Sequence, residues 1–211
     1  MSRYANVKPI NKGQLMHDEP QMPLSMHPKK FALWLFIVSI IMIFAAFSSA
    51  YLVRRAEGNW LEFDLPPMFW TTTAILVASS VTMQWAHFSA KINNMTGLKL
   101  GMVLTLLLGI GFLVGQWNAW QYLVEQNIFF GGNENDNPYP ANPSGSFLYV
   151  LTGVHAFHLV SGLVFLGIIT VAAFQYKVHS KSMTRIDMCA TYWHFLDVLW
   201  ISLFVFLLIN H

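Results

Sequence analysis

Four side chains that can carry protons or bind metals are grouped in two apolar stretches toward the C-terminus of the chain. His155 and His158 are three positions apart in one stretch, and His194 and Asp197 have the same spacing in the other. This spacing places both members of a pair on one face of a helix, one turn apart. Imidazole and carboxylate groups act as general acids and bases, as proton carriers and as metal ligands.

Asp197 is the one charged residue inside the apolar stretches. A charge near the middle of a bilayer costs several kcal/mol unless it is paired or neutralised, so Asp197 is a functional candidate. We expect His155 or His158 to pair with it across two helices, within an interhelical polar network that also includes His194 and Thr152. A structural hydrogen bond between helices and a direct role in proton handling are equally compatible with this pattern.

A metal or haem site is the alternative interpretation of the two histidines in the fourth stretch. His155 and His158 could share a metal ion, but such a site needs further ligands. The other imidazoles within apolar stretches are His194 and, near one end, His87. No carboxylate-rich ligand set accompanies the pair, so packing and hydrogen bonding are the favoured interpretation. We predict no metal site and no catalytic residue in this chain.

The elements that position these residues are five long apolar stretches. The chain has 211 residues, of which 10% are charged, against about 25% in a typical soluble domain. Such a composition argues against a disordered chain, a disulfide scaffold or a nucleic-acid-binding protein. Because a helix needs about 20 apolar residues to span a bilayer, we predict an all-α bundle of five transmembrane helices over residues 31–53, 67–88, 100–123, 147–174 and 188–209. These lie in one domain, 31–211, after an N-terminal tail, 1–30.

The distribution of basic residues predicts the orientation of the bundle. Ten of the 12 Lys and Arg residues fall in the N-terminal tail, the second loop and the fourth loop, and the other two are Arg54 and Arg55. Loops rich in Lys and Arg stay on the cytoplasmic side. We therefore expect a multi-pass protein of the bacterial cytoplasmic (inner) membrane, with its N-terminus in the cytoplasm.

Two runs of sequence resemble a known family. The run from Tyr192 to Trp200, YWHFLDVLW, resembles the signature of the last helix in subunit III of the haem–copper oxidases. The run from Thr152 to Gly162 is similar to the Gly-x-His-x-x-His-x-x-x-Gly helix of that family. The resemblance extends from about Lys30 to the end and fits the short, five-helix form of subunit III.

The resemblance implies a non-catalytic subunit of a respiratory terminal oxidase. Such a subunit stabilises the oxygen-reducing, proton-pumping subunit I, its main contact, beside subunit II and other oxidase subunits. Haem and copper are expected in those partners and not in this chain, which would hold phospholipid. Cytochrome c is the expected electron donor. The expected lipid-binding residues are Lys177, Lys181, Arg185 and Trp193, since basic side chains beside a span attract anionic head groups.

Several alternatives stay open. Within the same class, the chain could belong to a quinol oxidase, whose subunit III is very similar, or to nitric oxide reductase as an accessory subunit. In other classes it could be a small proton channel or transporter using His155, His158 and Asp197, or a membrane metalloenzyme. Ile40 and Ala119 stand at places where the family often has Glu. Their apolar side chains favour a structural and lipid-organising role over a proton relay.

Overall fold

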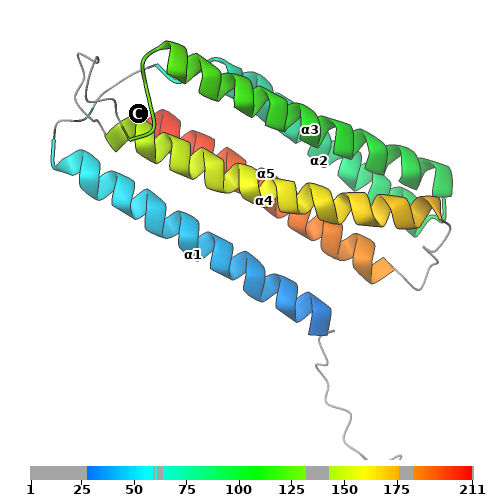
Figure 1. Ribbon diagram of the computed structural model, residues 1–211. Helices are drawn as coiled ribbons and strands as arrows, with labels where there is room; N and C mark the ends of the chain where they lie inside the picture. The colour runs from blue at the N-terminus through cyan, green and yellow to red at the C-terminus, as the bar shows by residue number, and fades with distance from the viewer. Residues whose placement is uncertain (1–27, 59, 61–63, 132–142, 176–182, 211) are drawn as a thin grey trace, which may run out of the picture.

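The computed structural model describes residues 28–58, 60, 64–131, 143–175 and 183–210, and all structural statements below concern these residues. They contain helices and no strand, which confirms the all-α prediction. The five helices are α1 (Pro28–Ala56), α2 (Met68–Lys91), α3 (Met95–Glu125), α4 (Pro143–Phe174) and α5 (Met183–Asn210). They run side by side, up and down, as an elongated bundle (Figure 1).

Four of these helices, α1, α3, α4 and α5, are long and apolar enough to cross a membrane. The predicted span at 67–88 does form a helix, α2, but its composition places it outside this group. The reason is a series of polar side chains, among them Thr72, Ser79 and Gln84. Several of its hydroxyls are bonded within the helix: Thr72 Oγ1 donates to the Phe69 carbonyl and Ser79 Oγ to the Leu76 carbonyl.

A tight turn joins α2 and α3 into a hairpin. Asn93 adopts a left-handed conformation with φ 56°, and the Asn94 side chain caps α3 by accepting a hydrogen bond from Gly97 N at 3.1 Å. The two helices then pack very closely. A Cβ added at Gly101 would lie 2.8 Å from Ala86 Cβ, so glycine is required for this approach.

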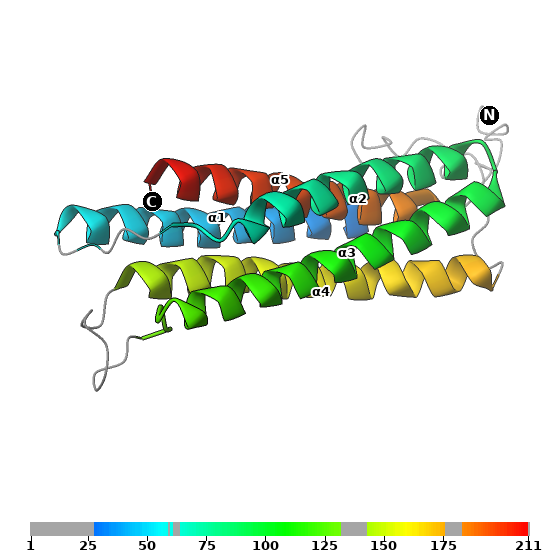
Figure 2. The ribbon, with the colours of Figure 1, turned by 90° about the horizontal axis from the view of Figure 1, so that it is seen from above.

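Helix α1 is set apart from the rest of the bundle. It lies along α4 and α5, on the opposite side from α2 and α3 (Figures 1 and 2). Only 17% of its most apolar window is buried, against 39–44% for α3, α4 and α5. Its far end is fixed to the C-terminus, where the Tyr51 hydroxyl donates to the Asn210 carbonyl at 3.0 Å.

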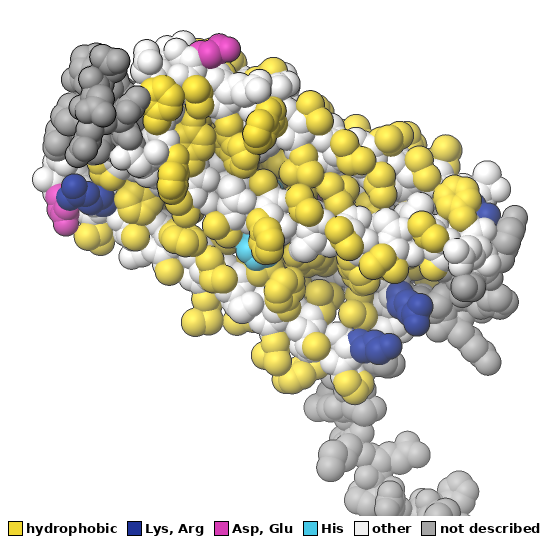
Figure 3. Space-filling view, viewed as in Figure 1, with side chains coloured by type: hydrophobic (Ala, Val, Ile, Leu, Met, Phe, Trp, Pro, Cys, Tyr) yellow, Lys and Arg dark blue, Asp and Glu magenta, His cyan; other side chains and the backbone are white. Residues whose placement is uncertain are grey.

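The surface has the layout of a membrane protein. In Figure 3 apolar side chains cover the length of the visible face, while Lys, Arg, Asp and Glu gather at its two ends. Exposed apolar residues are found on every helix, including Met42, Val81, Trp117, Phe157 and Ile209. In water such a surface would drive association, whereas hydrocarbon accepts it at no cost.

Candidate functional site

The signature run on α5 faces α2 and is hydrogen bonded to it along two helical turns. Trp193 Nε1 donates to Ser79 Oγ at 3.1 Å, and Trp200 Nε1 donates to Thr73 Oγ1 at 3.0 Å. Between them, His194 Nδ1 lies 2.7 Å from Ser80 Oγ. The polar residues that lower the hydropathy of α2 therefore serve as partners for α5. The pairs were not predicted, because apolar runs carry no information about register between helices.

Asp197 lies in the middle of this contact. It is 3% exposed, and neither carboxylate oxygen has a partner in full hydrogen-bond geometry among the described residues. Its nearest imidazole belongs to its own helix: His194 Nδ1 lies 3.9 Å from Asp197 Oδ2. The Ser80 hydroxyl of α2 bonds the same imidazole nitrogen, at 2.7 Å. His194 Nδ1 thus faces both Ser80 of α2 and Asp197 of its own helix.

The predicted pairing of Asp197 with a histidine of α4 was wrong. His155 is fully buried against Trp200 and Phe112, with ring centroids 5.0 and 5.8 Å away, and neither ring nitrogen is hydrogen bonded to a described residue. His158 Nδ1 lies 2.8 Å from the Val154 carbonyl of its own helix. Neither imidazole makes an ion pair or hydrogen bond with Asp197 within the part of the chain that the structure describes.

Helix geometry explains why the two imidazoles of α4 separate. Residues three apart differ by about 60° around the helix axis. This angle turns His155 toward α3 and α5, and it turns His158 toward α1, where it lies among the rings of Phe36 and Phe44 at 6.4 and 6.1 Å. Since the two residues meet different neighbours, they do not line one path together with Asp197.

Thr152 connects α4 to α3 instead of to the signature run. Its hydroxyl accepts a hydrogen bond from Trp120 Nε1 at 3.1 Å and donates to the Leu148 carbonyl at 2.7 Å. The link between α4 and α5 comes from Tyr192, whose hydroxyl lies 2.8 Å from Ser161 Oγ. The predicted single network is therefore a set of separate contacts, each joining one pair of helices.

A charged cluster joins three helices near the start of α5. Asp187 Oδ1 lies 2.8 Å from His87 Nε2 on α2, and Asp187 Oδ2 lies 3.5 Å from Lys30 Nζ on α1. Arg185 is exposed beside this cluster. Asp187 holds the ends of α1 and α2 to α5, a contact that cannot be predicted from the sequence, because the three residues are far apart along the chain.

The four residues predicted to bind lipid differ in their positions and in their exposure. Lys177 and Lys181 lie outside the described residues. Arg185 is exposed at the start of α5, as a head-group contact requires. Trp193 is 1% exposed and hydrogen bonded between α5 and α2, so it has no surface to offer a lipid, and its assignment was wrong.

No three His, Cys, Asp or Glu side chains come together as a metal-binding group among residues 28–58, 60, 64–131, 143–175 and 183–210. Cys189 is buried in α5.

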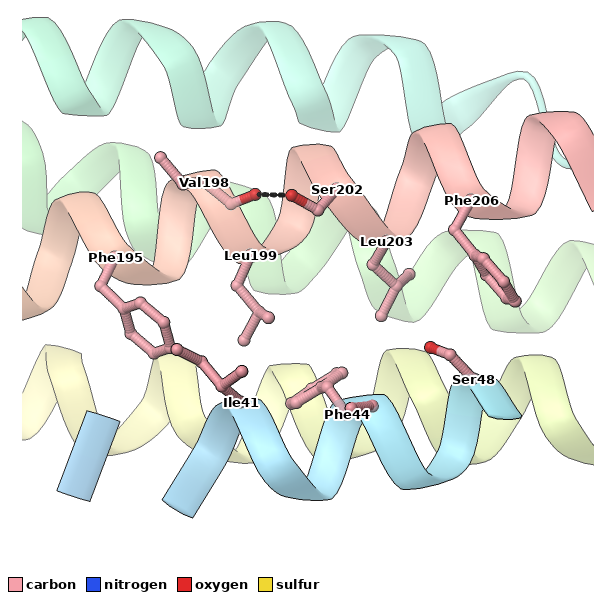
Figure 4. Close-up of a pocket in the computed structure, with 10 residues that line it drawn as sticks. Ile41, Phe44, Ser48, Phe195, Val198, Leu199, Ser202, Leu203 and Phe206 are labelled. Atoms are coloured by element: carbon pink, nitrogen blue, oxygen red, sulfur yellow. Dashed lines mark hydrogen bonds between the residues drawn. The ribbon is translucent and has the colours of Figure 1, made fainter. Parts of the chain in front are cut away.

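The described part of the chain contains a groove of about 520 Å³ between α1 and α5 (Figure 4). Its walls are apolar except for two hydroxyls, and they comprise Ile41, Phe44, Ala45, Ser48, Phe195, Val198, Leu199, Ser202, Leu203 and Phe206.

Comparison with known proteins identifies the family. A family model described as "Cytochrome c oxidase subunit III" matches residues 23–210. "Probable cytochrome c oxidase subunit 3" of Nocardia farcinica is 32% identical over 180 residues, covering 81% of this chain and 82% of that protein. "Cytochrome c oxidase subunit 3" of Homo sapiens is 29% identical over 189 residues, covering 83% of this chain and 67% of that protein. This chain belongs to the cytochrome c oxidase subunit III family.

Proposed function

We propose that this chain is the non-catalytic subunit III of a respiratory terminal oxidase, and that it stabilises the oxygen-reducing, proton-pumping catalytic subunit and organises lipid. The observation that carries the proposal is the family match over residues 23–210. Subunit I is the proposed main contact, with subunit II and other oxidase subunits alongside. Haem and copper would reside in those partners. Cytochrome c is the proposed donor, in keeping with the names of the relatives.

The contacts of the signature run support a stabilising role. Both indole nitrogens of the run and the imidazole of His194 are bonded to side chains of α2, and Tyr192 is bonded to α4. Hydrogen bonds between helices in a membrane contribute about 0.6 kcal/mol each on average. A run with four side chains bonded to neighbouring helices stiffens the bundle, and a stiff bundle offers its partner one fixed surface. Ile40, 1% exposed, keeps the α1 contact apolar.

The groove between α1 and α5 supports the lipid-organising role. Figure 4 shows Phe206 and Leu203 of α5 pointing across the groove toward Phe44 and Ser48 of α1. Apolar walls along two parallel helices fit an acyl chain. Arg185 lies at the starting end of α5, at a depth where a basic side chain attracts an anionic head group by about 1 kcal/mol.

The proposed orientation has the N-terminus in the cytoplasm of a bacterium and includes α2 as a fifth span. Because the helices alternate in direction, the described basic residues Lys29, Lys30, Lys91, Lys99 and Arg185 lie at one end of the bundle. The opposite end carries Arg54 and Arg55. This asymmetry agrees with the positive-inside rule. At about 1.5 Å per residue, the 24 residues of α2 are long enough for the hydrocarbon core.

Affinity purification tests the proposed function. The tagged chain is isolated from its native membranes in a mild detergent, and the copurifying proteins, the haem spectrum and oxygen consumption are measured. We expect a larger haem-containing subunit and oxygen uptake with reduced cytochrome c. A chain that elutes alone and free of haem would contradict the proposal. Oxygen uptake with quinol and none with cytochrome c would instead support the quinol-oxidase alternative.

A further inference from the structure

A second pocket, of about 500 Å³, lies on the flank of α3 near its C-terminal end. It is lined by Trp117, Trp120, Gln121, Val124 and Glu125. The indoles of Trp117 and Trp120 meet at an angle of 61°, with ring centroids 6.2 Å apart. The indoles of Trp117 and Trp120 thus form two walls of a corner. The Glu125 carboxylate lies one to two helical turns further along α3, toward the membrane boundary.

One wall of this corner is held in place by the neighbouring helix. Trp120 Nε1 donates to Thr152 Oγ1, and the Tyr149 hydroxyl lies 3.3 Å from the Trp120 carbonyl and 3.0 Å from the Ile128 carbonyl. The rings of Trp120 and Tyr149 also pack together, with their centroids 6.4 Å apart. Trp117, in contrast, is 59% exposed, and its indole nitrogen has no hydrogen bond with a described residue. The corner therefore combines a fixed indole with an accessible one.

The electrostatics of the pocket select a cation. Glu125 is exposed and makes no ion pair with any described residue. It is the last residue of α3, where the helix carries a partial negative charge and no basic residue occupies the last turn. Aromatic faces attract ammonium groups, and quaternary ammonium ligands are bound in aromatic cages. Two indoles and an unpaired carboxylate therefore suit a bound ammonium group.

This chain does not supply the cation itself. No Lys or Arg occurs between Lys99 and Lys177, a segment that contains three acidic residues. The basic residues at the same end of the bundle are Arg54 and Arg55, at the end of α1 on the opposite side from α3 (Figure 1). Arg54 is already paired with Glu57. No described Lys or Arg pairs with Glu125, so its carboxylate is available to a cation from outside the chain.

The surroundings of the pocket favour a lipid over a basic protein side chain. From Trp117 to Glu125 the pocket rises about 12 Å along the helix axis, the depth of a head-group region. Below it, the same flank of α3 continues as an exposed apolar track of Val114, Ile110 and Leu107. A basic side chain would use the corner alone. A phospholipid would use the corner for its head group and the track for an acyl chain.

We propose that the corner formed by Trp117, Trp120, Gln121 and Glu125 binds the ammonium head group of a zwitterionic phospholipid. The ammonium lies against the indoles and the Glu125 carboxylate. The Gln121 amide and the Trp117 indole nitrogen donate hydrogen bonds to the phosphate. An anionic phospholipid without an amine is disfavoured, because its phosphate would face Glu125 with no compensating cation.

Lipid titration followed by native mass spectrometry tests this site. The purified complex, or the chain alone if it purifies alone, is delipidated and titrated with phosphatidylethanolamine, phosphatidylcholine or phosphatidylglycerol. We expect preferential binding of the first two. Glu125→Gln and Trp117→Leu should each weaken that binding about two- to fivefold, the usual range for an exposed ion pair or a cation–π contact.

The matched control is Glu57→Gln, which removes an exposed carboxylate at the same end of the bundle but outside the pocket, and it should leave lipid binding unchanged. Equal binding of all three lipids, or equal losses in Glu125→Gln and Glu57→Gln, would overturn the proposal. So would loss of a protein subunit from Glu125→Gln without a change in bound lipid. Because bound lipid is counted per chain, the result does not depend on whether a haem-containing subunit copurifies.

Discussion

Replacing Gly109 with alanine is expected to destabilise the subunit through Trp193. An added Cβ at Gly109 would lie 2.7 Å from Trp193 Cη2 and 2.8 Å from Leu163 Cδ2. Since non-bonded carbons attract best at about 3.5–4.0 Å, both contacts are about 1 Å too short. Leu163 can relieve its contact by changing rotamer. The Trp193 ring is buried and bonded to Ser79, so it can retreat only by giving up that hydrogen bond.

Gly111 provides a matched control on the same helix. A Cβ added there meets nothing within 4 Å. Both substitutions gain the same helix propensity, up to about 1 kcal/mol, so this gain cancels when they are compared. What differs is about 1–3 kcal/mol of overpacking at Gly109 and about 1 kcal/mol for the lost hydrogen bond. Gly109→Ala should therefore be about 2–4 kcal/mol less stable than Gly111→Ala.

The free energy of unfolding can be measured by titrating the purified protein in mild detergent with dodecyl sulfate and following tryptophan fluorescence. A second comparison places Gly109→Ala in a Ser79→Ala background. If the displaced ring has already lost its bond to Ser79, the double variant should be less destabilised than the sum of the single variants. Equal stability of the two alanine variants would refute the argument that Trp193 is clamped between α2 and α3.

Three further substitutions, the last with a control variant, test other contacts of α5. Asp197→Asn should weaken retention of the chain in the oxidase complex more than it lowers initial turnover, measured by gel filtration and oxygen uptake; intact retention with an immediate loss of pumping would reverse this order. Asp187→Asn removes the ion pair with Lys30 and alters the hydrogen bond with His87, and it should cost about 1 kcal/mol, with less effect at high salt. Ser161→Ala removes the nearer partner of the Tyr192 hydroxyl and leaves the His158 carbonyl at 3.4 Å, so it should cost about 0.5–1.5 kcal/mol. Ser202→Ala, whose hydroxyl bonds only its own helix, should cost nothing measurable in the same unfolding assay.

The sequence was sufficient to predict five helices, because the length of an apolar run and the turn residues between runs are local properties. The ends were less well predicted. The fifth stretch was expected from residue 188, whereas α5 begins at Met183, since polar residues extend the helix beyond the apolar core. Composition also did not distinguish α2, whose hydroxyl groups are bonded within the helix or to α5, from its more apolar neighbours.

The contacts between helices required the structure. A helix that is apolar all round gives no indication of which face meets which neighbour. The spacing of His155 and His158 correctly implied adjacent positions, but not that a 60° turn would separate their environments. For the same reason the indole nitrogens of Trp193 and Trp200 could not be assigned to Ser79 and Thr73. The rotation of each helix about its axis and its register with its neighbours are set by the packing of all five helices.

The isolated position of α1 has a consequence for biosynthesis. This helix is made first, yet its neighbours α4 and α5 are made last, and the hydrogen bond from Tyr51 to Asn210 joins residues 159 positions apart. At a rate of synthesis of about 5–20 residues per second, about 8–30 s pass between the synthesis of Tyr51 and that of Asn210. During this interval it must rest in the bilayer as a single helix. Because most of the surface of α1 is apolar, the helix is compatible with hydrocarbon during this interval. Its contacts with α4 and α5 can form only after both of those helices have been synthesised.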